Sequence, residues 1–233
     1  MSRRIALVTG ANRGLGLEIC RQLAKNDFRV IQTARDPQKG QKAAKKLEKE
    51  GLDIIFHELD VTDPSSIDTI YDFVETEFER LDILVNNAGI FLDEEELAVK
   101  VAPGLIRKTM ETNFYGPLML SQKFIPLMER NNFGRIINIS SGWASLTNMR
   151  GGYPAYRVSK VALNALTRML SYELIDTNII VNSMNPGWLK TDMGGPDAER
   201  SVQKGAETVT WLALQPNGSP SGKFYIDQRE IDW

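Results

Sequence analysis

The sequence predicts an α/β fold: one doubly wound parallel sheet of about seven strands with helices on both faces, in a single domain spanning residues 1–233. Short apolar runs of strand-forming residues alternate along the chain with longer segments whose apolar residues recur at helical spacing. Polar or glycine-containing turns follow the strands. The length suits one large domain, and no linker or repeat divides the chain.

The first strand is predicted at residues 5–8, and it ends in a turn that contains Gly10, Gly14 and Gly16. Glycines leave the backbone N–H groups open to a phosphate, and the positive end of the following helix faces the same place. The glycine spacing differs from the common dinucleotide fingerprint. Two interpretations therefore stay open for the turn alone: a nucleotide phosphate cradle, or close packing of a helix against a sheet.

The remaining elements follow from the same alternation. Strands are predicted at residues 28–33, 53–59, 81–85, 134–139, 179–184 and 222–226. Helices are predicted at residues 39–51, 63–78, 94–128, from Pro154 onward, and at 198–214. The 39–51 helix has a solvent-facing composition. Prolines predict interruptions of the 94–128 helix near Pro103 and again near residues 115–117.

Composition excludes several classes of protein. The chain is 42% hydrophobic and 25% charged with a formal net charge of −2, and it has no basic run, which argues against a nucleic-acid partner. The single cysteine, Cys20, and the single histidine, His57, argue against disulfides and metal clusters, and both are predicted to be structural. The absence of a signal peptide or membrane-spanning run predicts a soluble, cytoplasmic protein.

The turn after the second strand indicates which dinucleotide would bind. In dinucleotide-binding folds, the residue about 20 positions after the glycines contacts the adenosine ribose. An acidic residue there accepts a hydrogen bond from the free 2′-OH of NAD, whereas an arginine accommodates the 2′-phosphate of NADP. Arg35 lies there, and Arg13 in the glycine turn is a second cation, so NADP is favoured over NAD. Two alternatives remain: Arg35 as a solvated loop charge, and Asp36 as a ribose acceptor.

Other strand ends also carry polar or small residues. Asp60 follows the third strand, where it can accept from an adenine amino group or cap a turn. Two asparagines followed by Ala88 and Gly89 leave room for a flat ligand after the fourth strand. The loop at residues 142–154, which includes Trp143, is more apolar than a surface loop requires and is predicted to form a substrate wall.

Tyr156 and Lys160 are four residues apart, so both side chains leave one face of a helix. A free phenol has a pKa of about 10, and a fixed ammonium nearby favours the phenolate and is expected to lower that pKa toward 7. Such a tyrosine can exchange protons at neutral pH. An exposed helix pair without function is the alternative.

Taken together, the motifs Thr9-Gly-Ala-Asn-Arg-Gly-Leu-Gly16, Asn86-Asn-Ala-Gly89, Asn113, Ser141, Tyr156-xxx-Lys160 and Pro186-Gly-xxx-Thr191 resemble those of the short-chain dehydrogenase/reductases. Within that family the chain is most similar to the NADPH-dependent carbonyl reductases, through residues 33–36, residues 186–192 and the ending at Trp233. The resemblance covers the whole chain and implies a Rossmann fold.

The resemblance implies the following roles. Tyr156 protonates the carbonyl oxygen, Ser141 donates a second hydrogen bond to it, Lys160 holds the nicotinamide ribose, and Asn113 anchors a water chain that resupplies the proton. From the residues alone, Ser140 and Ser141 stand equal. The implied NADPH contacts are Gly10, Asn12, Arg13, Gly14, Leu15, Gly16, Arg35, Asp60, Val61, Asn87, Ala88, Gly89, Tyr156, Lys160, Pro186, Gly187, Trp188 and Thr191. Trp143, Trp188 and Met193 are expected to contact substrate.

These expectations define an NADPH-dependent reductase of ketones, aldehydes and quinones, with NADPH/NADP+ as cofactor and no metal. The alternatives are an NADP-dependent alcohol dehydrogenase acting oxidatively and a non-catalytic NADP-binding redox sensor, which has no need of the serine, tyrosine and lysine. The first glycine turn is also compatible with a methyltransferase, but no motif later in the sequence supports that function. Only 14 residues separate Ser141 from Tyr156, without the large insertion of the vertebrate carbonyl reductases. A homodimer or homotetramer packed through the Tyr156 helix is therefore expected.

Overall fold

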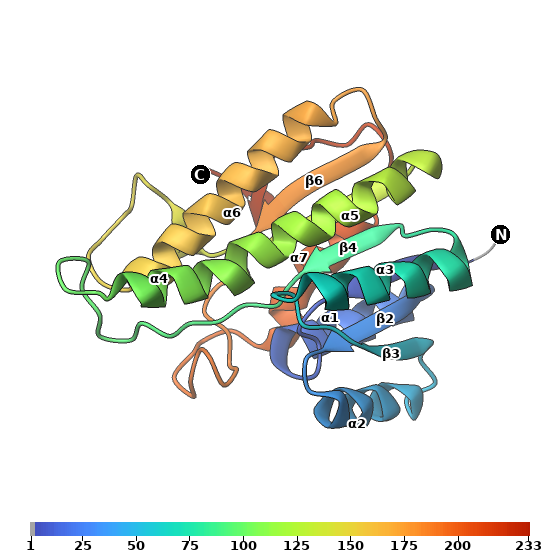
Figure 1. The fold of residues 1–233 in the computed structure, drawn as a ribbon, viewed down its shortest axis with the longest axis horizontal. Helices are drawn as coiled ribbons and strands as arrows, with labels where there is room; N and C mark the ends of the chain where they lie inside the picture. The colour runs from blue at the N-terminus through green and yellow to red at the C-terminus, as the bar shows by residue number, and fades with distance from the viewer. Residues whose placement is uncertain (1–2) are drawn as a thin grey trace.

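The computed structural model, which describes residues 3–233, contains one sheet of eight strands in the order β3-β2-β1-β4-β5-β6-β7-β8 (Figure 1). Seven strands are parallel, and β8 pairs antiparallel with β7. The strands are β1 (Arg4–Val8), β2 (Phe28–Ala34), β3 (Ile54–Glu58), β4 (Ile83–Asn86), β5 (Gly134–Ile139), β6 (Ile179–Met184), β7 (Phe224–Ile226) and β8 (Arg229–Ile231). The predicted doubly wound sheet is confirmed, with β8 as an additional strand.

The helices are α1 (Gly14–Lys25), α2 (Pro37–Glu48), α3 (Pro64–Phe78), α4 (Pro103–Met110), α5 (Gly116–Arg130), α6 (Pro154–Glu173) and α7 (Val202–Ala213). A π-helical turn, η1 (Glu111–Tyr115), joins α4 to α5, and a 3-10 turn, η2 (Gly142–Ala144), follows β5. The prediction that a helix begins at residue 94 was wrong. The chain stays irregular until Pro103, which occupies the first turn of α4 after the extended Ala102.

Two apolar layers cover the sheet, one on each face. Along β1 the side chains alternate: Ala6 and Val8 join the layer under α1, α2 and α7, while Ile5 and Leu7 join the layer under α3, α5 and α6. Figure 1 shows α3, α5 and α6 side by side on the same face. This is the arrangement that doubly wound sheets require.

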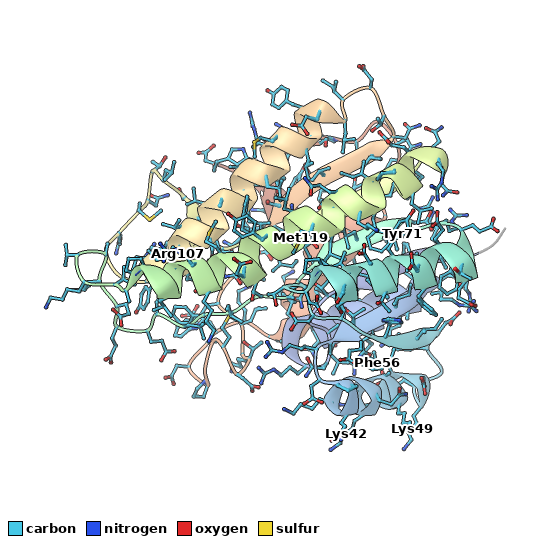
Figure 2. The ribbon with its side chains drawn as sticks, in the orientation of Figure 1. Lys42, Lys49, Phe56, Tyr71, Arg107 and Met119 are labelled. Atoms are coloured by element: carbon cyan, nitrogen blue, oxygen red, sulfur yellow. The ribbon has the colours of Figure 1, made fainter. Side chains whose placement is uncertain are left out.

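The solvent-facing character predicted for α2 is also observed. Lys42 and Lys49 point away from the molecule (Figure 2). On its inner side α2 lies so close to β3 that a Cβ at Gly40 would come within 2.0 Å of the Phe56 ring. One face of the helix is therefore packed and the other is solvated.

Aspartate caps fix where two helices begin. Asp36 accepts from the Lys39 amide (3.0 Å) ahead of α2, and Asp63 accepts from the Ser65 amide (2.9 Å) ahead of α3. Each cap precedes a proline in the first turn, where the missing N–H is not needed. The start of α3 at Asp63 was predicted, whereas α2 begins slightly earlier than expected.

Cys20 and His57 lie in packed surroundings, in agreement with the structural roles predicted for them. Cys20 is fully buried in α1. The His57 ring lies 4.9 Å from the ring of Phe73, and its Nδ1 contacts the Glu58 carbonyl. Among residues 3–233, no helix is long and apolar enough to cross a bilayer.

A buried polar row ties α6 to the middle of the sheet. Asn86 Nδ2 donates to Asn138 Oδ1 (2.8 Å), and Asn138 Nδ2 donates to Thr167 Oγ1 (2.8 Å) on α6. Thr167 also shares a hydrogen bond with Ser183 of β6 (2.8 Å). Because these groups are all buried, their pairing sets the position of α6 over β4, β5 and β6.

Candidate active site

The predicted functional residues gather at the carboxyl ends of the parallel strands. From β1 the chain moves outward to β2 and β3, then returns to add β4 on the other side of β1. Such a reversal opens a crevice beyond the carboxyl ends of β1 and β4, and doubly wound sheets bind ligands there. The turns after β1, β2, β3, β4, β5 and β6 all carry predicted site residues.

The turns after β1 and β4 are joined by hydrogen bonds. Thr9 Oγ1 accepts from the amides of Asn87 (3.0 Å) and Ala88 (2.9 Å), while Asn87 Nδ2 donates to the carbonyls of Thr9 (2.8 Å) and Gly10 (3.2 Å). Added Cβ atoms would lie 2.8 Å from Ala88 Cα at Gly10 and 2.5 Å from Asn87 Nδ2 at Gly16. Two of the three glycines therefore permit the close contact between these turns.

The start of α1 fits a diphosphate. Arg13 takes the N-cap position in extended conformation, and no side chain caps the helix. The amides of the first turn are thus left for a ligand, at the positive end of the helix. The Arg13 guanidinium forms an ion pair with Asp192, across from the glycine turn, and both side chains are largely exposed. Gly14 meets the same segment, since a Cβ there would lie 3.3 Å from Thr191 Cγ2.

At the ribose end, Arg35 is exposed directly after β2. The neighbouring carboxylate of Asp36 caps α2, and its hydrogen bonds to the backbone and side chain of Lys39 lower its pKa. Asp60 Oδ1 accepts from the amide (2.9 Å) and hydroxyl (2.7 Å) of Thr62, so this carboxylate caps the turn after β3. Val61 is buried beside it, against Gly116. Asp36 and Asp60 are thus occupied as capping residues, whereas Arg35 is exposed to solvent and caps no helix or turn.

Tyr156 and Ser141 meet at the middle of the edge. The Ser141 side chain lies near the Tyr156 hydroxyl and lowers its pKa, and it accepts from the Trp143 amide (3.2 Å). By contrast, the Ser140 hydroxyl is buried and has no partner among the described residues. Adjacent residues at a strand end point to opposite sides. The geometry thus separates two serines that stood equal by sequence.

Lys160 and Asn113 lie behind Tyr156. The Lys160 Nζ donates to the Ile139 carbonyl (2.7 Å) and is 5.7 Å from the centre of the Tyr156 ring. Asn113, in the π-helical turn, bonds both backbone groups of Ile90 (2.8 and 2.9 Å) and the Ser159 hydroxyl (3.0 Å). A Cβ at Gly89 would lie 3.5 Å from Asn113 Oδ1 and 3.6 Å from Lys160 Nζ. Glycine thus keeps the space between these groups open to a ligand hydroxyl.

Burial shifts the pKa values of this pair in opposite directions. It raises the pKa of Tyr156 to about 12, against a lowering by the Ser141 hydrogen bond, and the charge of Asp93 raises it further. Burial also lowers the pKa of Lys160 to about 8. The expectation that Lys160 brings the tyrosine pKa toward 7 is not met in this structure. The ammonium is directed to a backbone carbonyl, and apolar rings cover the phenol.

Aromatic rings surround the Tyr156 side chain. Trp143 stacks on Tyr153 (4.7 Å between centroids), and Phe91 packs edgewise on Tyr156 (5.2 Å) and Tyr153 (5.5 Å). Trp143 also lies perpendicular to Tyr156 at 6.1 Å and remains 41% exposed. The predicted wall at residues 142–154 is thus an aromatic cluster that opens to solvent beside the phenol.

The segment after β6 closes the other side of the edge. Gly187 takes a positive φ of 74°, and its amide donates to Asn185 Oδ1 (2.9 Å). Trp188 is exposed, with its indole N–H donating to the Gly194 carbonyl (2.7 Å), and Met193 is also exposed. Pro186 begins this turn, and Thr191 Oγ1 accepts from the Gly194 amide (3.1 Å). The loop is therefore held by its own hydrogen bonds.

Comparisons with known proteins agree with this geometry. Residues 4–201 match the family model described as short chain dehydrogenase. The chain belongs to the short-chain dehydrogenase/reductase family. It is 35% identical to carbonyl reductase [NADPH] 1 of Mus musculus over 100% of this chain and 99% of that protein. It is also 35% identical to (+)-neomenthol dehydrogenase of Arabidopsis thaliana, over 95% of each chain.

A solved structure of NADPH-bound carbonyl reductase from chicken fatty liver aligns over all of both chains, with a TM-score of 0.88 and 32% identity. The alignment to the mouse protein extends over 279 residues for a chain of 233. That relative therefore carries residues that this member of the family lacks.

Two residues of the site were missed by the sequence analysis. Phe91 belongs to the aromatic cluster, and Asp93 contacts the start of α6. Phe91 stands in an apolar run directly after the Asn-Asn-Ala-Gly turn, which is a signal that could have placed it in this family's site. Asp93 stands in a run of four acids, and nothing in that pattern distinguishes it from its exposed neighbours.

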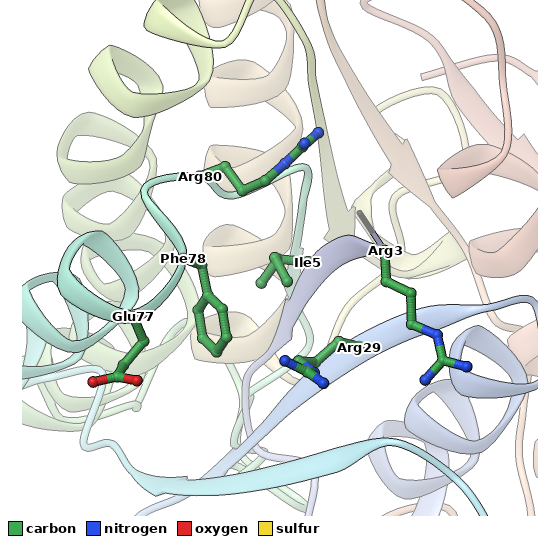
Figure 3. A pocket seen from close by; sticks show the side chains of 6 residues that line it. All are labelled: Arg3, Ile5, Arg29, Glu77, Phe78 and Arg80. Atoms are coloured by element: carbon green, nitrogen blue, oxygen red, sulfur yellow. The ribbon is translucent and has the colours of Figure 1, made fainter. Parts of the chain in front are cut away.

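The cavity in Figure 3 lies away from this edge. It has a volume of about 270 Å³ and is lined by Arg3, Ile5, Arg29, Glu77, Phe78 and Arg80, beside the amino ends of β1, β2 and β4. Its arginines are paired with carboxylates: Arg3 and Arg29 with Asp53, and Arg80 with Asp82. These pairs offset the cationic charge of the cavity, and the predicted site residues lie at the opposite edge of the sheet.

The buried ammonium predicts a cost in stability. Lys160 is 4% exposed, and the fall of its pKa from 10.5 to about 8 corresponds to about 3 kcal/mol. Loss of its hydrogen bond to Ile139 offsets about 1 kcal/mol. We therefore expect Lys160→Met to raise the free energy of unfolding by roughly 2 kcal/mol at neutral pH, measured by urea denaturation.

The pH dependence gives the control. The folded-state pKa lies below the unfolded-state value, so the penalty is fully present below pH 8 and fades as the pH rises toward 10.5. The stability gain of Lys160→Met should shrink accordingly, while Lys42→Met on the exposed face of α2 should give no such pH-dependent change. A gain that is absent at neutral pH, or independent of pH, would contradict the burial argument.

Proposed function

We propose that this chain is an NADPH-dependent carbonyl reductase that converts ketones, aldehydes and quinones to alcohols, within one cofactor-binding and catalytic domain spanning residues 1–233. The observation that carries the proposal is that Tyr156 lies near both Ser141 and Lys160 at the carboxyl edge of a doubly wound sheet. The similarity to carbonyl reductase [NADPH] 1 over the full chain supports it. A redox sensor without catalysis would not need these three side chains.

The residues divide the work between binding and proton transfer. The uncapped start of α1 would hold the diphosphate, Arg35 the 2′-phosphate, and Lys160 the nicotinamide ribose. When bound, NADPH supplies the hydride. Tyr156 Oη would hold the proton for the carbonyl oxygen, and Ser141 Oγ would donate a second hydrogen bond to that oxygen. Asn113 would anchor the water chain that returns the proton, beside the space that Gly89 keeps open.

Burial raises the pKa of Tyr156 to about 12, so the phenol holds its proton at neutral pH. The similarity to carbonyl reductase [NADPH] 1 of Mus musculus supports reduction over the oxidative alternative.

The first test removes the proton donor. Tyr156→Phe keeps the ring in its aromatic contacts but loses the hydroxyl, so kcat for carbonyl reduction should fall about 10²- to 10⁴-fold. The measurement is the loss of reduced-nicotinamide absorbance with a panel of carbonyl compounds. Tyr172→Phe, on the exposed part of the same helix, is the matched control and should retain activity. Undiminished turnover in Tyr156→Phe would remove the catalytic assignment.

The second test concerns the cofactor. Arg35→Ala should weaken NADPH binding about tenfold because a charge-assisted contact to the 2′-phosphate is lost, and it should leave NADH binding unchanged. Dissociation constants can be measured by quenching of tryptophan fluorescence. Lys42→Ala removes a cation from α2, which begins just after Arg35, and should affect neither cofactor. Equal losses for NADPH and NADH would argue against the contact.

Substrate selection is proposed for the exposed apolar groups on the loops. Trp143 lies against Tyr156 and thus beside the proton donor. Trp188 and Met193 are exposed on the loop after β6. Apolar side chains so placed select for the shape of the carbonyl compound. We further propose that the protein works in the cytoplasm, without a nucleic-acid or membrane partner.

We also propose self-association through α6, as a homodimer or homotetramer. Val158, Met169 and Tyr172 are exposed at 49%, 51% and 65%, and with Ala162 and Ala165 they repeat every three or four residues along one side of α6. Such a stripe is typical of a helix that packs on another helix. The short segment between Ser141 and Tyr156 supports the same proposal, since no large insertion is present to cover the helix.

Light scattering coupled to size-exclusion chromatography tests this association. The parent protein should elute as a dimer or tetramer, and Met169→Glu should shift it toward the monomer because a charge would be buried in the interface. Lys49→Glu, on the outer face of α2, should leave the mass unchanged. A strict monomer for the parent would reject the proposal.

A further inference from the structure

Asp93 is a buried carboxylate in the irregular segment between β4 and α4. Its side chain is fully buried, although the next two residues, Glu94 and Glu95, are exposed. Its Oδ2 accepts from the amides of Ala155 (2.7 Å) and Tyr156 (3.2 Å), more than sixty residues further along the chain. Its Oδ1 is buried without a hydrogen-bond partner among the described residues. Burying a carboxylate that has one unpaired oxygen is costly in free energy.

The contacts of Asp93 replace a missing helix cap. The N-cap residue of α6, Tyr153, has a positive φ of 55°, and its side chain makes no capping hydrogen bond. Pro154 in the first turn supplies no N–H. The next two amides, which a capping side chain would normally bind, both donate to Asp93 instead. The carboxylate thus lies at the positive end of the helix that carries Tyr156 and Lys160, and this position offsets part of the cost of its burial.

The same segment is tied to the site at two further points. The backbone of Ile90 is held by Asn113, and the Glu96 carbonyl accepts from the Tyr153 amide (3.1 Å). Between these ties, Phe91 packs against the Tyr156 ring. Asp93 therefore connects the turn after β4 with the start of α6 through fixed contacts rather than through a mobile surface loop.

We propose that Asp93 is a positioning residue for Tyr156: its carboxylate fixes the first turn of α6, and its negative charge acts on the phenol from the segment after β4. The inference rests on the proposed function. A cap needs only an oxygen acceptor, which a neutral side chain also offers. The carboxylate adds a charge, which lies at the positive end of α6 and also acts on the phenol.

Charged groups of both signs act on the phenol from the elements around it. Lys160, on the same helix, has its Nζ 5.7 Å from the ring centre, and Arg157 lies over the Trp143 ring at 5.0 Å while its Nε donates to the Gly152 carbonyl (3.0 Å). A cation close to a phenol favours the phenolate, but Lys160 donates to the Ile139 carbonyl and Arg157 to the Gly152 carbonyl. From the β5 side, Ser141 contributes a neutral hydroxyl that also lowers the tyrosine pKa. Asp93 opposes them, since its negative charge raises that pKa.

The experiment compares neutral and charged replacements at this position. Asp93→Asn keeps an oxygen acceptor for the two amides but removes the charge. Its phenolate should form at a pH lower by about half a unit or more, and the alkaline limb of kcat/KM for carbonyl reduction should move down equally. Asp93→Ser, a neutral N-cap former, should show the same shift, and Asp93→Glu should stay close to the parent. Glu94→Gln, an exposed neighbour, is the matched control and should shift neither measurement.

Two readouts separate the possible failures. The phenolate of Tyr156 is followed by ultraviolet difference absorbance against the same variant combined with Tyr156→Phe, which requires no turnover, and far-ultraviolet circular dichroism verifies folding at each pH. If the parent lacks carbonyl reductase activity while the phenolate still shifts, the proposed function fails and the effect of Asp93 on Tyr156 stands. An unshifted phenolate in every folded neutral variant overturns the inference, as does a shift that Glu94→Gln reproduces.

Discussion

The site depends on one set of hydrogen bonds, made where the order of the strands reverses. Thr9 and Asn87 join the turn after β1 to the turn after β4 through four contacts between side chains and backbone. These bonds satisfy buried backbone groups that no strand can pair, because the two turns lie beyond the sheet. They also require glycine at positions 10 and 16, where a Cβ would strike the opposing turn. The glycine motif thus first joins the two halves of the sheet, and the phosphate cradle follows from that junction.

Buried polar contacts connect this junction to α6 and so fix the position of that helix. Asn86, one residue before the junction, continues into the row through Asn138 to Thr167, and the backbone of Ile90, just after it, is held by Asn113. Both sets of contacts lead to Lys160. Thr167 lies on the same helix as Lys160, and Asn113 faces Lys160 across the space beside Gly89. Groups that a catalytic site must hold within about 0.5 Å of their productive positions are thereby placed by rigid elements on both sides.

The sequence allowed the sheet and the strand ends to be predicted because their signals are local. The strands at residues 134–139 and 179–184 were placed to the residue, since buried parallel strands are short apolar runs with polar ends. Local signals could not predict the conformation of the segment after β4. Its acidic run resembles the first turn of a helix, but Asp93 serves a different helix through a contact made by tertiary folding alone. Strand β8 was missed for a related reason, because its hairpin places Asp227 and Gln228, rather than glycines, at positive φ.

The spacing of Tyr156 and Lys160 was visible in the sequence, but the direction of the shift in the tyrosine pKa was not. Spacing says that an ammonium can stand near a phenol, whereas burial decides which protonation states are favoured, and burial is a property of the folded chain. Here Phe91 and Trp143 cover the phenol, and Lys160 turns its charge to the Ile139 carbonyl. Desolvation penalises the charged form of each group, so the pKa of the phenol rises while that of the ammonium falls. The two shifts share one cause, the withdrawal of both groups from water, and at neutral pH they leave a neutral phenol beside a charged ammonium.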